Sequence, residues 1–329
     1  MKITKNIEVP TGNIVCVKGE KGDLEFVSVG DYGKEVNLKA DFLGLNQSPK
    51  PFQHTEMLPL SEKWVITVST QYGCAMKCKF CDVPKVGNGK NATLDDLNGQ
   101  ISAGLMLHPE VQRSDRLNIH FARMGEPTFN KNILACAKWL KRDIDPKYNV
   151  HPVISTMMPH KNKHLKAFIG AWMNIKNILY KGNAGLQLSI NSTNESERAE
   201  MFSGNALYLA EIANVMDGIK PKGRKITLNF AVAGYEIDPK ILLNFFSPDR
   251  YLIKLTPMHK TDSAQNNNIR TSGDFTSYHP YESYEKDLKQ AGYDVIVFLA
   301  SEYEDMGRIT CGNAILSGTM PEVPHKILI

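Results

Sequence analysis

Three closely spaced cysteines are the residues of this chain best suited to chemistry. Cys74, Cys78 and Cys81 lie in the run CAMKCKFC, shortly after the apolar, strand-like run WVITVST. Thiolates this close repel one another unless a metal or a cluster neutralises them, and iron–sulfur clusters are held by such thiolates. Three ligands rather than four leave one iron of a cubane open to another molecule. The spacing therefore predicts a 4Fe–4S cluster that takes part in a reaction.

Two other uses of the cysteines fit the spacing less well. A structural zinc site takes four protein ligands, and the nearest downstream histidine, His108, is remote from the motif. A disulfide framework is typical of small secreted chains, whereas this sequence has six cysteines in 329 residues and opens without an apolar signal segment. Zinc stays open as an alternative, in which the protein would be a non-catalytic binding module.

The composition is that of a globular protein without extreme charge. Hydrophobic residues make up 42% and charged residues 22% of the chain, and no apolar run reaches the length of about 18 residues that a membrane span requires. We therefore expect no membrane partner and a reducing cytoplasmic location, where thiolates survive. The net charge of +4 is too small to demand a nucleic acid. Basic residues that could track phosphates nonetheless gather at two places: Lys77, Lys79, Lys85 and Lys90, and Lys220, Lys222, Arg224 and Lys225.

The apolar pattern divides the chain into two parts. Residues 1–58 hold short strand-like runs at 13–19, 24–30 and 34–40, which predicts a small β-rich N-terminal module. In residues 59–329, strand-like runs alternate with helix-like stretches, which indicates a parallel sheet with helical crossovers and a partial barrel. The seven strand-like runs are 64–70, 116–122, 150–156, 185–191, 225–231, 251–257 and 294–300.

Polar side chains follow three of these strands, at the end of a barrel where chemistry takes place. After the second strand, Glu126 in RMGEPTFN places a carboxylate between Gly125 and Pro127. Ser155 and Ser189 end the next two strands. Their hydroxyls suit hydrogen bonds to a ligand, although N-capping of the following helices is an equal alternative.

Cys311 is a second reactive candidate, because it lies in the polar, glycine-containing run DMGRITCGNAILSG after the last strand. If this segment folds back over the barrel, it brings a thiol to the predicted cluster. Cys16 and Cys136 have apolar neighbours and are expected to be buried packing residues.

Together these motifs resemble the radical S-adenosylmethionine (SAM) superfamily and, within it, the RlmN/Cfr family of RNA methyltransferases. The resemblance rests on VSTQYGCAMKCKFC, MGEPTFN, ISTMMP, LSINSTNESER and TCGNA, within residues 63–318. It implies an α/β fold, a partial (β/α)6 TIM-like barrel, with 4Fe–4S and SAM as cofactors. It further implies that the three clustered cysteines bind the metal cluster and that SAM is held by Glu126, Ser155, Ser189, Asn191 and His259.

The resemblance also implies a reaction. In that family a cysteine at the position of Cys311 is methylated by one SAM, and a radical made from a second SAM activates this methyl group for addition to an adenine carbon. An RNA or nucleotide substrate and a flavodoxin-like or ferredoxin-like electron donor would follow. Thr67 stands where the family carries a further cysteine, which keeps open a radical SAM enzyme of non-methylating chemistry.

Overall fold

The computed structural model describes residues 1–50, 56–272 and 277–328, and each of the seven predicted strand segments of the barrel forms a strand in it. These strands lie side by side and parallel, in the order of the chain, within one larger sheet. Their bounds are β5 (Trp64–Val68), β8 (Leu117–Phe121), β9 (Val150–Thr156), β10 (Gly185–Ser189), β11 (Ile226–Val232), β12 (Tyr251–Pro257) and β13 (Asp294–Phe298).

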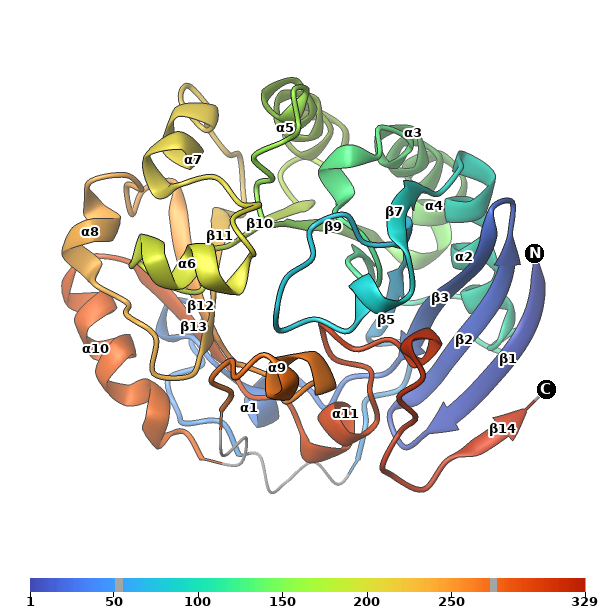
Figure 1. The fold of residues 1–329 in the computed structure, drawn as a ribbon. Helices are drawn as coiled ribbons and strands as arrows, with labels where there is room; N and C mark the ends of the chain where they lie inside the picture. The colour runs from blue at the N-terminus through green and yellow to red at the C-terminus, as the bar shows by residue number, and fades with distance from the viewer. Residues whose placement is uncertain (51–55, 273–276, 329) are drawn as a thin grey trace.

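Helices between the strands surround the sheet, so the predicted partial α/β barrel is confirmed. In Figure 1 the strands curve around an open centre, most helices lie outside them, and α6 and α9 lie nearer the centre. None of the helices in the described ranges is long and apolar enough to cross a membrane. The bounds are α2 (Leu94–Met106), α3 (Asn132–Trp139), α4 (Asp145–Tyr148), α5 (Leu165–Asn174), α6 (Glu195–Met201), α7 (Leu209–Val215), α8 (Pro239–Leu243), α9 (Asp262–Asn266) and α10 (Glu282–Gln290).

The hydrophobic core lies between the sheet and the outer helices. Gly104 of α2 approaches β5 so closely that a Cβ there would lie 3.0 Å from Cδ1 of Ile66. The rings of Phe121 on β8 and Trp172 on α5 meet edge to face, with centroids 6.4 Å apart. Because successive strand residues point to opposite faces, the neighbours of these apolar residues must face the centre of the barrel.

The centre of the barrel is polar. Residues that pair across neighbouring strands share a face, and the inward-facing pairs include Thr67 with His120 and Asn229 with Lys254. Closed barrels of this type fill the same positions with branched apolar side chains. Here the lining residues are half-buried, so the interior can take a polar ligand.

The N-terminal strands extend the same sheet. Strands β1 (Lys2–Val9), β2 (Gly12–Gly19) and β3 (Gly22–Val29) are antiparallel, and β3 pairs with β5. The short strand β14 (Lys326–Leu328) pairs with the free side of β1. The backbone hydrogen bonds therefore continue from the N-terminal strands into the barrel, and the proposed domain boundary at residue 58 stays a prediction.

One predicted strand is wrong. Residues 34–40 form the short helix α1 (Lys34–Asn37) followed by β4 (Leu38–Lys39). The chain turns at Gly33, whose φ is 94°, and only Leu38 and Lys39 pair with a strand, at the edge of β13. Alternating apolar residues alone could not show that the rest of the segment has no strand to pair with.

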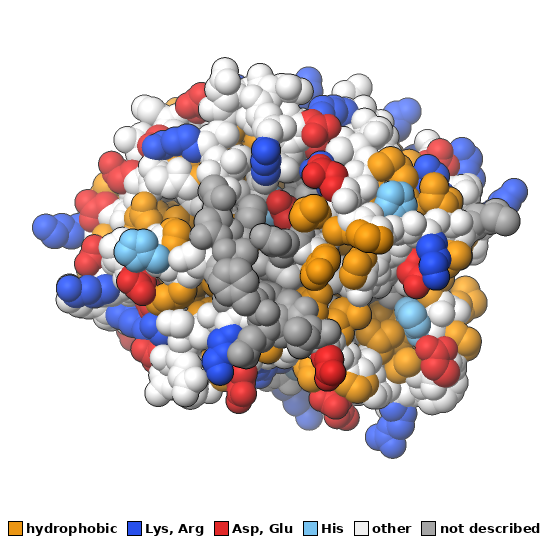
Figure 2. Space-filling model, turned by 90° about the horizontal axis from the view of Figure 1, so that it is seen from below, with side chains coloured by type: hydrophobic (Ala, Val, Ile, Leu, Met, Phe, Trp, Pro, Cys, Tyr) orange, Lys and Arg blue, Asp and Glu red, His pale blue; other side chains and the backbone are white. Residues whose placement is uncertain are grey.

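The run DSAQNNNIRTSGDF (262–275) is mostly polar, which predicts a loop, but it begins with helix α9. The Thr261 hydroxyl caps this helix by accepting the Ala264 N–H at 3.0 Å. Residues 273–275 of the run lie outside the described residues. On the face of the molecule in Figure 2, acidic and basic side chains are interspersed around hydrophobic ones, in keeping with the small net charge.

Candidate active site at the mouth of the barrel

The predicted cluster loop is framed by a short sheet of its own. Strands β6 (Gln71–Gly73) and β7 (Asn88–Asn91) pair antiparallel on either side of it. At the end of β6, Gly73 has a φ of 77°, and a Cβ there would lie 2.1 Å from the Gly87 carbonyl oxygen. Only glycine allows this close approach. It lets Cys74 donate its N–H to the same carbonyl at 3.0 Å.

The three thiols lie close together. Cys74 and Cys78 are buried and Cys81 is half-buried. Burial raises the pKa of all three thiols, to about 11 for Cys74. The pKa of Cys78 rises further because Cys81 and Cys74 are near enough for thiolate charges to repel. Binding to a metal cluster would stabilise the thiolates, because metal ligands must be deprotonated.

Three cysteine thiols without a fourth ligand match the donor set of an iron–sulfur cluster that leaves one iron open. Among the described residues, no group of three His, Cys, Asp or Glu side chains is arranged to hold a single metal ion. The N–H of Met76 points at the Cys74 sulfur, 3.5 Å away, and that of Val83 stabilises the thiolate of Cys81. Backbone hydrogen bonds to sulfur tune the potential of iron–sulfur clusters.

Glu126 lies in the turn after β8, with its carboxylate between the ends of β8 and β9. The side chain is almost fully buried, and burial raises its pKa. Oε1 accepts the Thr128 N–H at 3.0 Å, the Thr128 hydroxyl at 2.7 Å and the Thr156 hydroxyl at 2.6 Å. Oε2 accepts the Met157 N–H at 3.0 Å. The carboxylate is therefore fixed in direction, and Oε2 carries the fewer of these bonds.

Gly125 allows the turn that aims Glu126, because its φ is 99° and a Cβ would lie 2.6 Å from the Gln71 side chain. We expect Gly125→Ala to lower the free energy of unfolding by about 1–3 kcal/mol through this strain. Urea denaturation measures the change. The matched control is Gly170→Ala in α5, where the new methyl group meets open space and a gain of about 0.5–1 kcal/mol is expected. Equal effects of the two substitutions would contradict the strain argument.

The remaining predicted ligand residues also lie at strand ends. Ser155 is the second-to-last residue of β9 and Ser189 the last of β10, and both are half-buried. Neither caps a helix, since α5 follows His164 and the N-cap of α6 is Asn194. Asn191 is buried, and its Oδ1 accepts the Ala231 N–H at 3.2 Å.

His259 follows the end of β12. Its Nδ1 lies 2.9 Å from Oδ1 of Asp305, which belongs to helix α11 (Glu302–Met306). This contact orients the ring and engages one of its two nitrogens.

Cys311 is exposed in a loop that folds back onto the cluster loop. The Gly312 carbonyl accepts the Asp82 N–H at 2.8 Å, and a Cβ on Gly312 would lie 3.9 Å from Cα of Cys81. Cys311 is also close enough to raise the pKa of the Cys81 thiol. The structure therefore places the Cys311 thiol beside those of Cys74, Cys78 and Cys81.

An ion pair that the sequence did not predict holds this loop. The Glu25 carboxylate on β3 accepts a hydrogen bond from Nε–H of Arg123 at 2.8 Å and another from a terminal N–H of the same guanidinium at 2.5 Å. Both side chains are almost fully buried. The Glu25 carboxylate also accepts the N–H groups of Ile315 at 3.2 Å and Leu316 at 3.0 Å. Arg123 donates to the Arg308 carbonyl at 2.8 Å. The one available signal was a lone carboxylate within the apolar run LEFVSVG.

No family model matches the chain. It is 24% identical over 188 residues to the dual-specificity RNA methyltransferase RlmN 2 of Myxococcus xanthus, covering 53% of this chain and 45% of the relative. It is 27% identical over 220 residues to RlmN of Campylobacter lari, covering 62% of this chain and 54% of the relative. The chain thus spans about half the length of these curated relatives.

A solved structure of a radical SAM methyltransferase from Sphaerobacter thermophilus resembles almost the whole chain. The TM-score is 0.65 at 17% identity, and the match covers 95% of this chain and 81% of the other. The fold is therefore the partial barrel of the radical SAM enzymes. By sequence, the chain is similar to members of the RlmN family at 24–27% identity. The cofactors of that family are a 4Fe–4S cluster and SAM, and the site described above fits both.

Proposed function

We propose that this protein is a radical SAM methyltransferase that transfers a methyl-derived carbon to an adenine carbon, in RNA or in a nucleotide, through Cys311. The observation that carries the proposal is the Cys311 loop, which is docked on the cluster loop by the hydrogen bond from Asp82 to Gly312. The names of the relatives support RNA methylation as the general class of activity.

The three neighbouring thiols of Cys74, Cys78 and Cys81 would hold the cluster. When bound and reduced, the cluster and SAM supply a carbon-centred radical. Glu126 would hold the ammonium group of SAM through Oε2, the oxygen that accepts a single hydrogen bond. Since the carboxylate is fixed by four donors, it would orient SAM without rearranging, which favours catalysis.

The other proposed SAM contacts come from the next strands. The hydroxyls of Ser155 and Ser189 would accept or donate hydrogen bonds at the inner ends of β9 and β10. Asn191 would use its amide nitrogen, because its oxygen is engaged by Ala231. His259 would use the ring nitrogen that does not face Asp305. An electron donor of flavodoxin or ferredoxin type completes the proposal.

Methyl labelling of Cys311 tests this function. The purified protein is reconstituted with iron and sulfide under anaerobic conditions and incubated with SAM labelled in its methyl group. We expect peptide mass spectrometry to find the label on Cys311 in the wild-type chain, and the Cys311→Ala variant to remain unlabelled. The Cys136→Ala variant is the control, because this buried thiol lies on α3, outside the proposed site. SAM cleavage that continues without label on Cys311 would rule out the methyl-carrying role.

One observation favours a second function, a radical SAM enzyme that does not transfer methyl. Thr67 stands where the family has the cysteine that releases the product by forming a disulfide, and a hydroxyl cannot do so. The other two thiols, Cys16 on β2 and Cys136 on α3, are both buried, and burial raises the pKa of Cys16 to about 12. Neither is suited to replace the missing thiol. The labelling experiment distinguishes the two functions.

A further inference from the structure

Several cations line the lower part of the barrel interior, away from the cysteines. Lys63 directly precedes β5, Arg116 directly precedes β8, and Arg224 lies two residues before β11. All three therefore lie where parallel strands begin. Lys254 lies in the middle of β12, on the same inner face as Asn229. The start of the strands is opposite to the end that carries the cysteines, which makes this a separate region of the barrel.

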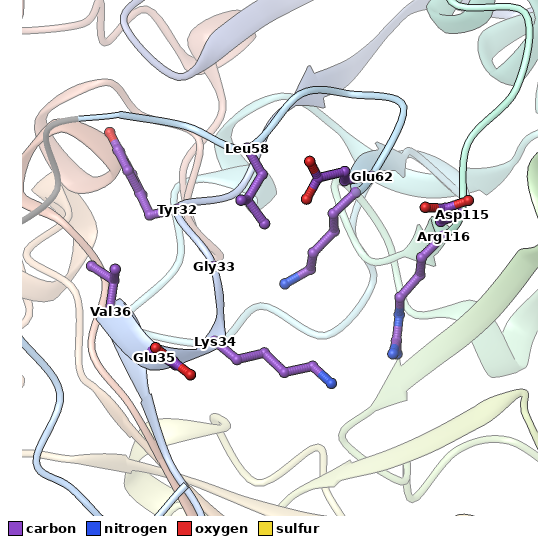
Figure 3. Close-up of a pocket in the computed structure, with 10 residues that line it drawn as sticks. Tyr32, Gly33, Lys34, Glu35, Val36, Leu58, Glu62, Asp115 and Arg116 are labelled. Carbon is purple, nitrogen blue, oxygen red and sulfur yellow. The ribbon is translucent and has the colours of Figure 1, made fainter.

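Two of these cations, Lys63 and Arg116, line a cavity of about 750 Å³. Figure 3 shows Lys34, the first residue of α1, and Arg116, just before β8, extending toward the same open space. The acidic side chains that line the cavity, those of Glu35, Glu62 and Asp115, are exposed at its edge. A volume of this size is typical of pockets for small molecules, about 300–1,000 Å³.

Few carboxylates neutralise these cations, of which Arg224 is exposed and Lys63, Arg116 and Lys254 are half-buried. Lys63 pairs with Asp31 at 2.6 Å, but in the described part of the chain no carboxylate lies within ion-pair distance of Arg116, Arg224 or Lys254. Both guanidinium groups donate to neutral oxygens, Arg116 to the Asn118 side chain at 3.1 Å and Arg224 to the Asn183 carbonyl at 3.4 Å. Like charges near one another repel, and an anion bound between them relieves that repulsion.

Burial and the positive potential of these cations lower the pKa of two histidines. Burial, together with Lys254, Arg224, Lys63 and Arg116, lowers the pKa of His120 to about 3. Burial and the two arginines likewise lower the pKa of His151 to about 4. Both imidazoles are therefore neutral at physiological pH and leave the surrounding cations free to bind an anion. A bound anion would reverse part of this effect.

We propose that the lower barrel interior binds the phosphate group of a small nucleotide, which is the substrate of the proposed methyl transfer. Guanidinium groups recognise phosphate through paired, charge-assisted hydrogen bonds. Lys254 lies between this region and the mouth of the barrel, because it stands in the middle of β12 on the inner face. A nucleotide with its phosphate among the cations can thus direct its base toward Cys311. The enclosed position favours a mononucleotide over an RNA chain.

Binding of AMP to the reconstituted protein tests this inference. S-adenosylhomocysteine is added at saturation so that AMP cannot occupy the SAM site, and affinity is measured by calorimetry against adenosine and inorganic phosphate. We expect Arg116→Gln and Lys254→Met to weaken AMP binding on the order of tenfold each, as loss of a charge-assisted contact predicts. The control is Arg142→Gln, whose exposed guanidinium pairs with Asp143 outside the barrel. Circular dichroism verifies that each variant is folded.

The other outcomes are equally informative. AMP that binds no better than adenosine, or equally well to all variants, would overturn the inference, and so would inorganic phosphate binding as tightly as AMP. A short RNA that binds through Arg116 more tightly than AMP would overturn the small-molecule assignment. As a second measurement, AMP should raise the pKa of His120 in nuclear magnetic resonance titrations. The inference rests on the proposed function, but the two are separable: Cys311 can be labelled while AMP fails to bind, or the reverse.

Discussion

The Cys78→Ala variant is expected to lose its iron and its ability to cleave SAM. Reconstituted wild-type protein should bind about four irons per chain, and the variant almost none, because two thiolates cannot retain a cubane that needs three. Changes to residues that merely support metal ligands already reduce activity by about 10–100-fold. Loss of a ligand should therefore reduce 5′-deoxyadenosine formation by more than this. Iron analysis and chromatography of the products measure both effects.

Cys136→Ala is the matched control for this experiment. It removes an equally buried thiol, but from helix α3 on the outer side of the sheet. Iron content and SAM cleavage should remain at the wild-type level. Retention of the full complement of iron by Cys78→Ala, or recovery of one zinc per chain from the wild-type protein, would contradict the cluster.

Replacing Arg123 by Met is expected to lower the free energy of unfolding by about 3–5 kcal/mol, which is typical when one partner of a buried ion pair is removed. Glu25 would keep its bonds from Ile315 and Leu316 but lose its counter-charge. The loop that carries Cys311 would also lose the bond from Arg123 to the Arg308 carbonyl. We therefore expect faster proteolytic cleavage between residues 307 and 316, in addition to lower stability in urea.

Two further variants make this prediction specific. Glu25→Gln combined with Arg123→Met removes both charges and should recover part of the lost stability, because no unpaired carboxylate remains buried. Arg142→Gln, in an exposed ion pair with Asp143, should leave stability and proteolysis unchanged. If the protease cleaves the Arg123→Met variant no faster than the Arg142→Gln variant, the ion pair does not position the loop.

Much of the fold could be predicted from sequence because the barrel strands are local patterns. Each of the seven strands combines β-branched and apolar residues within a short run, and helical stretches separate most of them. The run 34–40 shows the limit of this reasoning. Its alternation resembles that of a strand, but strand formation depends on a partner, and only Leu38 and Lys39 find one on β13.

The candidate site was predictable where its residues are close in sequence or at strand ends. The spacing of Cys74, Cys78 and Cys81 and the turn at Glu126 are of this kind. The pairing of Glu25 with Arg123 was not predictable, because 98 residues separate the two in the sequence and they share no motif. The cationic region was hidden for the same reason: Arg116 and Arg224 precede β8 and β11, which have two strands between them in the sheet and share one end of the barrel only once it has formed.

The position of Glu25 gives the first three strands a role beyond extending the sheet. A shortened protein beginning after residue 58 would keep every cluster cysteine and the whole parallel barrel. It would nevertheless expose the edge of β5 to aggregation and leave the segment bearing Cys311 without its main anchor. Efforts to excise a minimal catalytic core should therefore retain the N-terminal strands, which act as a clamp on the opposite end of the chain.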